Sequence, residues 1–213
     1  MPEITGLVPL RGVRGRLRVF LDEEYAFTVS EKKIAHMELK VGNAIDPREM
    51  LETVCEDEKN RALHSALYFL GRAERSRAQV VRYLEAREYL PEIIEGVIEK
   101  IEEYGYVNDT RFAGMLLNDR AKIRGKSRRA IKHEMAEKGL DAQTIEDAMA
   151  QYDQADEHRN AMHIAKKYYM KNEGNRQDFE RKAGAALFRR GYDYDVIREV
   201  LHAVQDGREE EEE

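Results

Sequence analysis

The chain has 213 residues, of which 37% are charged and 8% aromatic, with no Trp and one Cys. This composition leaves few apolar residues for the core of one large sandwich or barrel. A lone cysteine excludes an intramolecular disulfide. No apolar run approaches the ~20 residues of a membrane-spanning helix and the N-terminus lacks the pattern of a secretory signal, so we expect a cytoplasmic protein.

The formal net charge of −6 conceals a strong segregation of charge along the chain. Residues 111–140 carry nine Lys or Arg against three Asp or Glu, whereas residues 141–213 carry eleven against eighteen. Arguments about a binding partner therefore rest on the basic segment and not on the sum of charges.

The first part of the chain, residues 1–59, is predicted to form a β-hairpin and a helix. Apolar and polar residues alternate on both sides of an acidic turn within residues 16–29, which is the pattern of two paired strands. Ser30 then begins a short helix, and Asp46 followed by Pro47 marks the start of a longer one.

The rest of the chain is organised by an internal repeat. Three segments align without gaps at offsets of 51 and 52 residues: LEAREYLPEIIEGVI (84–98), MAEKGLDAQTIEDAM (135–149) and LFRRGYDYDVIREVL (187–201). A period near fifty residues indicates a tandem helical array. Apolar stripes at helical spacing predict three helices in each unit.

We therefore expect a mainly α protein with three tandem three-helix repeats after the N-terminal hairpin and helix. The predicted repeats cover residues 60–107, 108–155 and 156–205, and an acidic tail at 206–213 is expected to be disordered. Ser76 with Gln79 is predicted to cap a middle helix, and Gly139 and Gly191 to end the middle helices of the later repeats.

Sequence signatures of enzymes are absent. The chain has no GxxxxGK[ST] phosphate loop, no GxSxG and no HExxH, and its six His never pair at i,i+4. The glycine pair Gly12 and Gly15 precedes a strand and is expected to form a turn. We therefore predict a protein that is not an enzyme and has no metal or cofactor.

The strongest candidate site is a basic stretch within 13 residues: Arg120, Lys122, Arg124, Lys126, Arg128, Arg129 and Lys132. Arg128 and Arg129 fall in the first turn of a helix capped by Ser127, where the helix dipole disfavours cations. Because the sequence shows no compensation, the pattern favours an anion-binding site for phosphate or a carboxylate surface. The alternative is a solvated surface of i,i+4 ion pairs.

Related cations recur in the other repeats. Arg75 and Arg77 flank Ser76 as Arg128 flanks Ser127, and Arg87, Lys138 and Arg190 occupy one aligned position. The full set of predicted partner- or DNA-binding residues is Arg75, Arg77, Arg87, Arg120, Lys122, Arg124, Lys126, Arg128, Arg129, Lys132 and Lys138. Tyr104, Tyr106 and Phe112 are predicted either to stack on bases or to hold the turn between two units.

From the hairpin to about Gln205 the chain resembles the RecX family, the regulators of the RecA recombinase. The resemblance rests on an ordered set of motifs: Ala66-Leu67-x-x-Leu70, Arg75-Ser76, the junction from Gly105 to Ala113, Arg124-Gly125-Lys126-Ser127, and the repeat endings at Gly139 and Gly191. Two features depart from it. Phe179 stands where Ser76 and Ser127 are expected, and the chain ends in five Glu.

The resemblance implies an elongated, curved array that binds in the groove of the RecA–single-stranded DNA filament. It also implies inhibition of filament growth, ATP hydrolysis, strand exchange and coprotease activity, and hence roles in homologous recombination, DNA repair and the SOS response. Expected partners are RecA and single-stranded DNA, with double-stranded DNA as a further candidate, and we expect a monomer. The alternative function is that of a stand-alone DNA-binding helical repeat protein.

Overall fold

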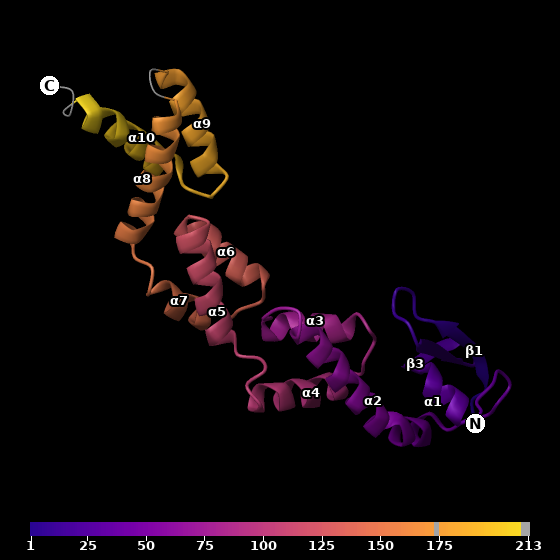
Figure 1. The fold of residues 1–213 in the computed structure, drawn as a ribbon. Coiled ribbons are helices and arrows are strands. Elements are labelled where there is room, and N and C mark those ends of the chain that lie inside the picture. Colours follow the sequence, from indigo (N-terminus) through magenta and orange to yellow (C-terminus); the bar gives the residue numbers. More distant parts are fainter. Residues whose placement is uncertain (173–174, 210–213) are drawn as a thin grey trace. The chain divides into compact units, whose positions relative to one another are not determined.

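The computed structural model describes residues 1–172 and 175–209, without the side chains of residues 47, 49, 51, 54, 208 and 209. The chain divides into two compact units, Met1–Asn108 and Asp109–Glu213. The first contains a small sheet and four helices, and the second is helical throughout its described part (Figure 1). The predicted mainly α fold with a small N-terminal β element is confirmed.

The N-terminal sheet has three antiparallel strands, β1(Ile4–Pro9), β2(Arg16–Leu21) and β3(Glu24–Ser30), in the order β1-β2-β3. The predicted hairpin is β2 and β3, joined by Asp22 and Glu23 with φ of 47° and 72°. Positive φ at both turn residues gives a hairpin the twist of its strands. The sequence prediction missed β1, because Gly6 and a register shift between Ile4 and Gly6 interrupt its alternation.

One face of the sheet is buried against α1(Glu31–His36), which begins after Ser30 as predicted. The side chain of Ser30 accepts a hydrogen bond from the amide of Lys33 at 3.2 Å, a helix cap. Val19, Phe27 and Val29 form the centre of this core with Ile34 from the helix. Because successive side chains of a strand point to opposite faces, the apolar side chains at every second position gather in one cluster.

A single helix, α2(Pro47–Leu70), runs from the sheet into the first repeat. The sequence suggested a boundary between residues 59 and 60, but the helix continues through it. The first repeat packs α2 with α3(Arg77–Glu85) and α4(Pro91–Glu103) around Leu84, Ile98 and Ile101. The predicted capping box of α3 is confirmed, since Ser76 accepts from the amide of Gln79 and Gln79 accepts from that of Ser76.

The second unit contains two further repeats. The second repeat consists of α5(Asp109–Asn118), the π-helical turn η1(Asp119–Ile123), α6(Arg128–Glu137) and α7(Ala142–Met149). The third consists of α8(Gln154–Lys171), α9(Arg176–Phe188) and α10(Tyr194–Glu209). Each has its own apolar cluster, centred on Ile131 and Met135 in the second repeat and on Phe179 and Leu187 in the third.

The ends of the middle helices follow one rule with one exception. Gly139 after α6 and Gly191 after α9 have φ of 84° and 88°, the left-handed conformation predicted for them. In the first repeat Glu88 takes this conformation with φ of 56°. Its side chain accepts hydrogen bonds from Arg18 and from Thr28, the latter at 2.6 Å. Glu88 therefore ends α3 and also connects the sheet to the first repeat through hydrogen bonds.

The departure at Phe179 has a structural reason. The helix α9 begins at Arg176 with Asn175 as its cap, so it extends about a turn further toward its N-terminus than α6 does. Position 179 therefore lies inside the helix, where Phe179 is buried and packs edge-on against Tyr169 at a centroid distance of 4.9 Å. A capping serine has no role at that place.

The expected disordered tail at 206–213 needs a correction. The helix α10 continues to Glu209, so residues 206–209 are helical. Extending an existing helix adds a backbone hydrogen bond per residue, and His202 lies 2.5 Å from Asp206 one turn later. Residues 210–213 are outside the described part of the chain.

Candidate nucleic-acid and partner interface

The predicted cations of the first unit lie against aromatic rings or carboxylates. The Arg75 guanidinium lies 4.6 Å from the centre of the Phe69 ring, and Arg87 lies 3.5 Å from that of Tyr83. Arg77 forms an ion pair with Glu102 at 3.3 Å. Such contacts stabilise the first repeat. A role of these residues in binding stays a prediction.

In the second unit, two of the predicted cations converge on one carboxylate. Arg120 Nε donates to Glu134 at 2.8 Å, and Lys126 Nζ donates to the same carboxylate at 2.9 Å. Hydrogen bonds from Arg120, followed by those from Lys126, lower the pKa of Glu134 to about 2. The π-helical turn η1 carries Arg120, and its side chain is only 18% exposed. These cations therefore connect the turn to α6.

Arg128 and Arg129 have the compensation that their sequence context lacks, so that part of the sequence argument was wrong. The Arg128 amide donates to Glu157 at 2.8 Å, and the Arg129 guanidinium pairs with Asp193 at 2.9 Å. Both carboxylates belong to the third repeat. Glu157 therefore caps the backbone at the positive end of α6 and Asp193 pairs with the charge of Arg129, whereas the Arg128 guanidinium donates to the Met149 carbonyl at 3.3 Å.

Ser127 completes the junction between the second and third repeats. Its hydroxyl donates to the Gly191 carbonyl at 2.7 Å while it accepts from the Ala130 amide at 3.2 Å. Its own amide donates to the Arg190 carbonyl at 3.0 Å. A Cβ on Gly191 would lie 2.6 Å from the Ala130 Cβ, so only glycine allows this approach. The basic capped turn is thus a structural joint.

Lys132 also has a carboxylate partner. It bridges α6 and α7 through an ion pair with Glu146 at 2.6 Å.

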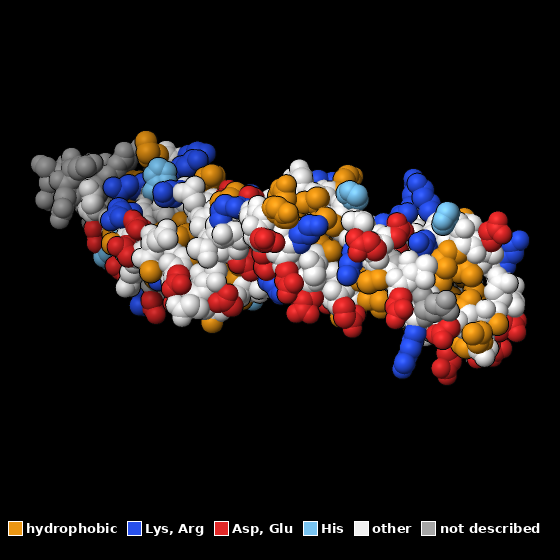
Figure 2. Space-filling view, turned by 90° about the horizontal axis from the view of Figure 1, so that it is seen from below, with side chains coloured by type: hydrophobic (Ala, Val, Ile, Leu, Met, Phe, Trp, Pro, Cys, Tyr) orange, Lys and Arg blue, Asp and Glu red, His pale blue; other side chains and the backbone are white. Residues whose placement is uncertain are grey.

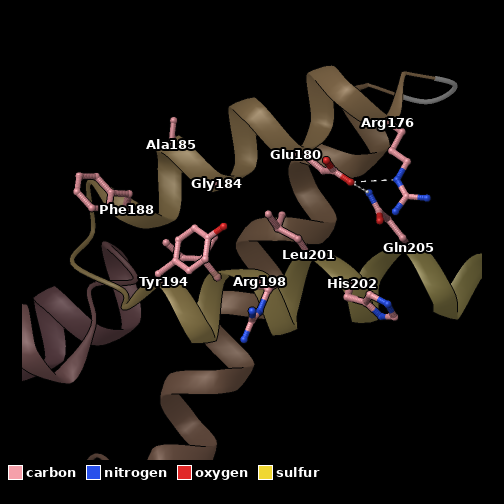
Figure 3. A pocket seen from close by; sticks show the side chains of 11 residues that line it. Arg176, Glu180, Gly184, Ala185, Phe188, Tyr194, Arg198, Leu201, His202 and Gln205 are labelled. Atoms are coloured by element: carbon pink, nitrogen blue, oxygen red, sulfur yellow. Dashed lines mark hydrogen bonds and ion pairs between the residues drawn. The ribbon is translucent and has the colours of Figure 1, made fainter.

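At the positions aligned with Lys132 and Glu146, the third repeat has Gly184 and Arg198, and there the space between α9 and α10 is open. The result is an apolar groove of about 520 Å³, in which Figure 3 shows Tyr194 and Leu201 beneath Gly184.

Two other predicted cations line a second groove, which we call the α8 groove. Lys122 and Arg124 from the second repeat face α8 across a space of about 330 Å³. The charged or imidazole side chains that line it are Lys122, Arg124, His163, Lys167, Lys171 and Arg190. Among the described residues, none of those lining the groove is acidic.

A groove of the first unit, lined by Arg14, Arg61 and Arg87, shares this absence of acidic residues in the described part of the chain, but on much of the surface the two charges are mixed. On the face shown in Figure 2, Lys and Arg side chains are interspersed with Asp and Glu. His163, Lys167 and Lys171 were missed in the sequence because they are about forty residues from the basic stretch. Their i,i+4 spacing, which places them on one side of a helix, was the available signal.

The aromatic candidates separate into two kinds. Phe112 is buried in the core of the second repeat and cannot stack on a base, so that part of the alternative was wrong. Tyr104 and Tyr106 are 66% and 53% exposed, with ring centroids 6.5 Å apart. Base stacking by these two tyrosines stays a prediction.

Comparison with known proteins places the chain in a family. Models of the first, second and third three-helix domains of RecX match residues 62–100, 108–149 and 155–201. The regulatory protein RecX of Bacillus subtilis strain 168 is 30% identical over 206 residues, covering 96% of this chain and 78% of that protein. The chain belongs to the RecX family. The regulatory protein RecX of Clostridioides difficile is 29% identical and covers 89% of each chain.

Solved RecX structures share the fold. RecX from Lactobacillus salivarius has a TM-score of 0.60 at 21% identity, over 70% of this chain and 98% of that one. A second crystal structure of regulatory protein RecX has a TM-score of 0.57 at 21% identity, over 94% and 98% of the two chains. The predicted family and the three helical domains are therefore confirmed.

The described part of the chain shows neither a cluster of metal ligands nor a membrane-spanning helix. Within residues 1–172 and 175–209, no three His, Cys, Asp or Glu side chains are grouped as metal ligands would be. In the same part of the chain, every helix is too short or too polar to cross a bilayer.

Proposed function

We propose that this chain is a non-enzymatic regulator of the RecA recombinase. The observation that supports it is family membership, since relatives that match nearly the whole chain are named regulatory protein RecX. The proposal places the protein in the cytoplasm as a monomer, with roles in homologous recombination, DNA repair and the SOS response.

The proposed mechanism is binding in the groove of the RecA–single-stranded DNA filament. A helical repeat array can present several surfaces to a periodic partner, because each repeat offers a similar face. Binding there limits filament growth, ATP hydrolysis, strand exchange and coprotease activity.

The contacts of the predicted cations suggest which of them meet the partner. Lys122 and Arg124 are exposed and line the α8 groove, and Arg124 also pairs with Asp119 at 3.1 Å on the solvent-exposed surface. Arg120, Lys126, Arg128 and Arg129 are engaged with Glu134 or with the third repeat. In the proposal Lys122 and Arg124 contact the filament, whereas the others maintain the shape of the surface.

The test measures RecA ATPase activity on single-stranded DNA with wild type, K122E/R124E and R128E/R129E. We expect K122E/R124E to lose most of the inhibition with at most a small drop in melting temperature, because both side chains are exposed and the Arg124–Asp119 pair lies at the surface. R128E/R129E should lose both inhibition and thermal stability, since it places an acid beside Asp193 and removes the hydrogen bond from the Arg128 guanidinium to the Met149 carbonyl. K32E/K59E, which changes the net charge equally at exposed sites of the first unit, is the control and should inhibit fully.

Full inhibition by K122E/R124E would remove these residues from the interface. No effect of the wild-type protein on RecA ATPase activity, filament growth or strand exchange would remove the function itself.

The α8 groove favours the second candidate function, a stand-alone DNA-binding protein. Such a protein would bind naked DNA with an affinity that falls steeply with salt, because cations release counterions from phosphates. It would also affect recombinase only at ratios that cover the DNA. A regulator of the filament acts at low ratios to recombinase.

A further inference from the structure

We infer that the α8 groove is a binding site for the phosphodiester backbone of a single nucleic-acid strand, with Tyr168 as a stacking surface for a base. The site joins two repeats and includes residues of α8 that lie outside the basic stretch. The inference deepens the proposed function, because the RecA filament contains such a strand. It makes a separate claim about naked nucleic acid.

Most charges of the groove are available to a ligand, whereas Arg124 pairs with Asp119 at 3.1 Å. Among the described residues, no carboxylate lies within ion-pair distance of the ammonium groups of Lys122, Lys167 or Lys171. The Arg190 guanidinium donates to two backbone carbonyls, of Arg124 at 3.1 Å and of Ala186 at 2.8 Å. These neutral acceptors orient Arg190 and leave its positive charge uncompensated.

The spacing of the α8 residues suits an extended chain of negative charges. His163, Lys167 and Lys171 are four residues apart, so they lie along one side of the helix at intervals of about 6 Å. Lys171 is also in the last turn of α8, where a cation is favoured by the helix dipole. A row of this kind can contact successive phosphates of one backbone.

The two walls of the groove are held at a defined separation. The side-chain amide of Asn160 donates to the Ala121 carbonyl at 3.1 Å, and this hydrogen bond connects α8 to the π-helical turn. Gly125 has φ of 57°, and a Cβ there would lie 2.8 Å from Ile164 Cδ1. A side chain at this position would strain the backbone and displace the end of Ile164, so glycine favours the close approach to α8. This approach brings Lys122 and Arg124 to the same space as Lys167.

The lining residues favour a single strand over a duplex or an acidic protein. Tyr168 and Ile123 also line the groove, and Ile123 is 73% exposed. Proteins that bind single strands combine a cationic groove with rings on which unpaired bases stack. In a duplex the faces of the bases are stacked on each other, and an acidic protein surface presents no bases that could stack on the Tyr168 ring. The combination of cations and ring therefore indicates a polyanion with exposed planar groups.

The test is the salt dependence of binding to a fluorescent oligo(dT), followed by anisotropy with the full chain. Removing one cation that binds a phosphate should reduce the slope of log K against log salt by about 0.7 for a single strand. We expect K167Q to reduce the slope by about 0.7 and K122Q/K167Q by about 1.4. K166Q is the matched control, because Lys166 is the exposed neighbour on α8 that does not line the groove.

Tyr168 is tested separately, because its ring also packs against the core of the third repeat. Y168L should weaken binding about 5- to 150-fold at unchanged salt slope, and Y168F, which keeps the ring, should bind as wild type does. The melting temperature of each variant identifies loss of folding, and a loss of affinity that Y168F shares would contradict stacking.

Three results would overturn the inference. In the first, K167Q and K166Q bind oligo(dT) with the same affinity and slope. In the second, millimolar inorganic phosphate at constant ionic strength displaces the oligonucleotide, and free phosphate is then the ligand. In the third, K167Q binds oligo(dT) normally but no longer inhibits RecA ATPase, and the groove is then a protein contact. All three results leave the proposed function standing, and the third shows that the groove serves that function through a protein ligand.

Discussion

At the residue scale, the charges of this chain act mainly through specific partners. Glu134 receives hydrogen bonds from Arg120 and Lys126, and its side chain is only 15% exposed. Arg129 meets Asp193 across the junction of two repeats. The same cations that resemble a binding patch in the sequence therefore also determine how the second and third repeats are joined.

The lowered pKa of Glu134 predicts acid sensitivity. Because the pKa falls from 4.5 to about 2 on folding, Glu134 stays ionised in the folded chain at pH values that protonate it in the unfolded chain. Its contribution to the free energy of unfolding is complete above pH 4.5 and is lost as the pH falls toward about 2. We expect E134Q to lower that free energy by about 1–3 kcal/mol at pH 7 and hardly at all at pH 2.

Denaturant unfolding at pH 2, 4.5 and 7 measures this effect. E137Q on the exposed side of the same helix is the control and should show a difference from wild type that changes little over this range. An equal loss for E134Q at pH 7 and at pH 2 would contradict the prediction.

At the element scale, small differences between repeats decide what each helix can do. The first repeat ends its middle helix with Glu88, which holds the sheet, whereas the second and third use Gly139 and Gly191. The third repeat extends α9 and places Phe179 in its core. Helices of one common pattern thus acquire different neighbours through single positions.

Gly191 is the glycine whose replacement should matter most at the junction. G191A forces a side chain into the left-handed region, which costs about 1–2 kcal/mol, and brings its Cβ against Ala130. Overpacking adds about 1–3 kcal/mol. G105A is the matched control, because Gly105 has φ of 69° and open space around it, so it loses only the conformational part. Denaturant unfolding followed by circular dichroism compares the two, and equal losses would show that the contact with α6 is unimportant.

At the scale of the whole molecule, contacts distant in sequence attach the β-sheet to the helical repeats. Arg16 on β2 pairs with Glu58 on α2 at 2.5 Å, and its guanidinium lies 4.0 Å from the centre of the Tyr89 ring. Both charged side chains are at most 5% exposed. Buried ions of this kind are tolerated only because each satisfies the other.

Breaking this pair one side at a time should therefore be costly. We expect R16M to lose about 3–5 kcal/mol because Glu58 is left buried and unpaired, and R16M/E58M to lose less. R18M removes an ion pair to Glu88 whose arginine is 42% exposed, and it should lose much less stability than R16M. A double-mutant cycle by denaturant unfolding measures the coupling. Strictly additive losses at the two positions would contradict the account.

The sequence alone determined the features that follow local rules. Helical periodicity, the recurrence of one segment at offsets of 51 and 52 residues, the Ser76–Gln79 cap and the glycines at 139 and 191 identified three helical units and the family. Such features depend on residues within one or two turns of each other, so a sequence contains them in full. The strand β1, whose alternation is broken at Gly6, did not meet these rules and was missed.

Only the tertiary structure decided which charges have partners and which are open to a ligand. Ser127 and Gly191 are 64 residues apart, and Lys122 and Lys167 are 45 apart, yet each pair meets at the junction of the second and third repeats. The electrostatic energy of a charged side chain depends on its burial and on the groups around it. Packing brings those groups together from distant parts of the chain. For that reason only the tertiary structure shows that Arg128 and Arg129 lie at the junction of two repeats, whereas Lys122 and Arg124 line the α8 groove.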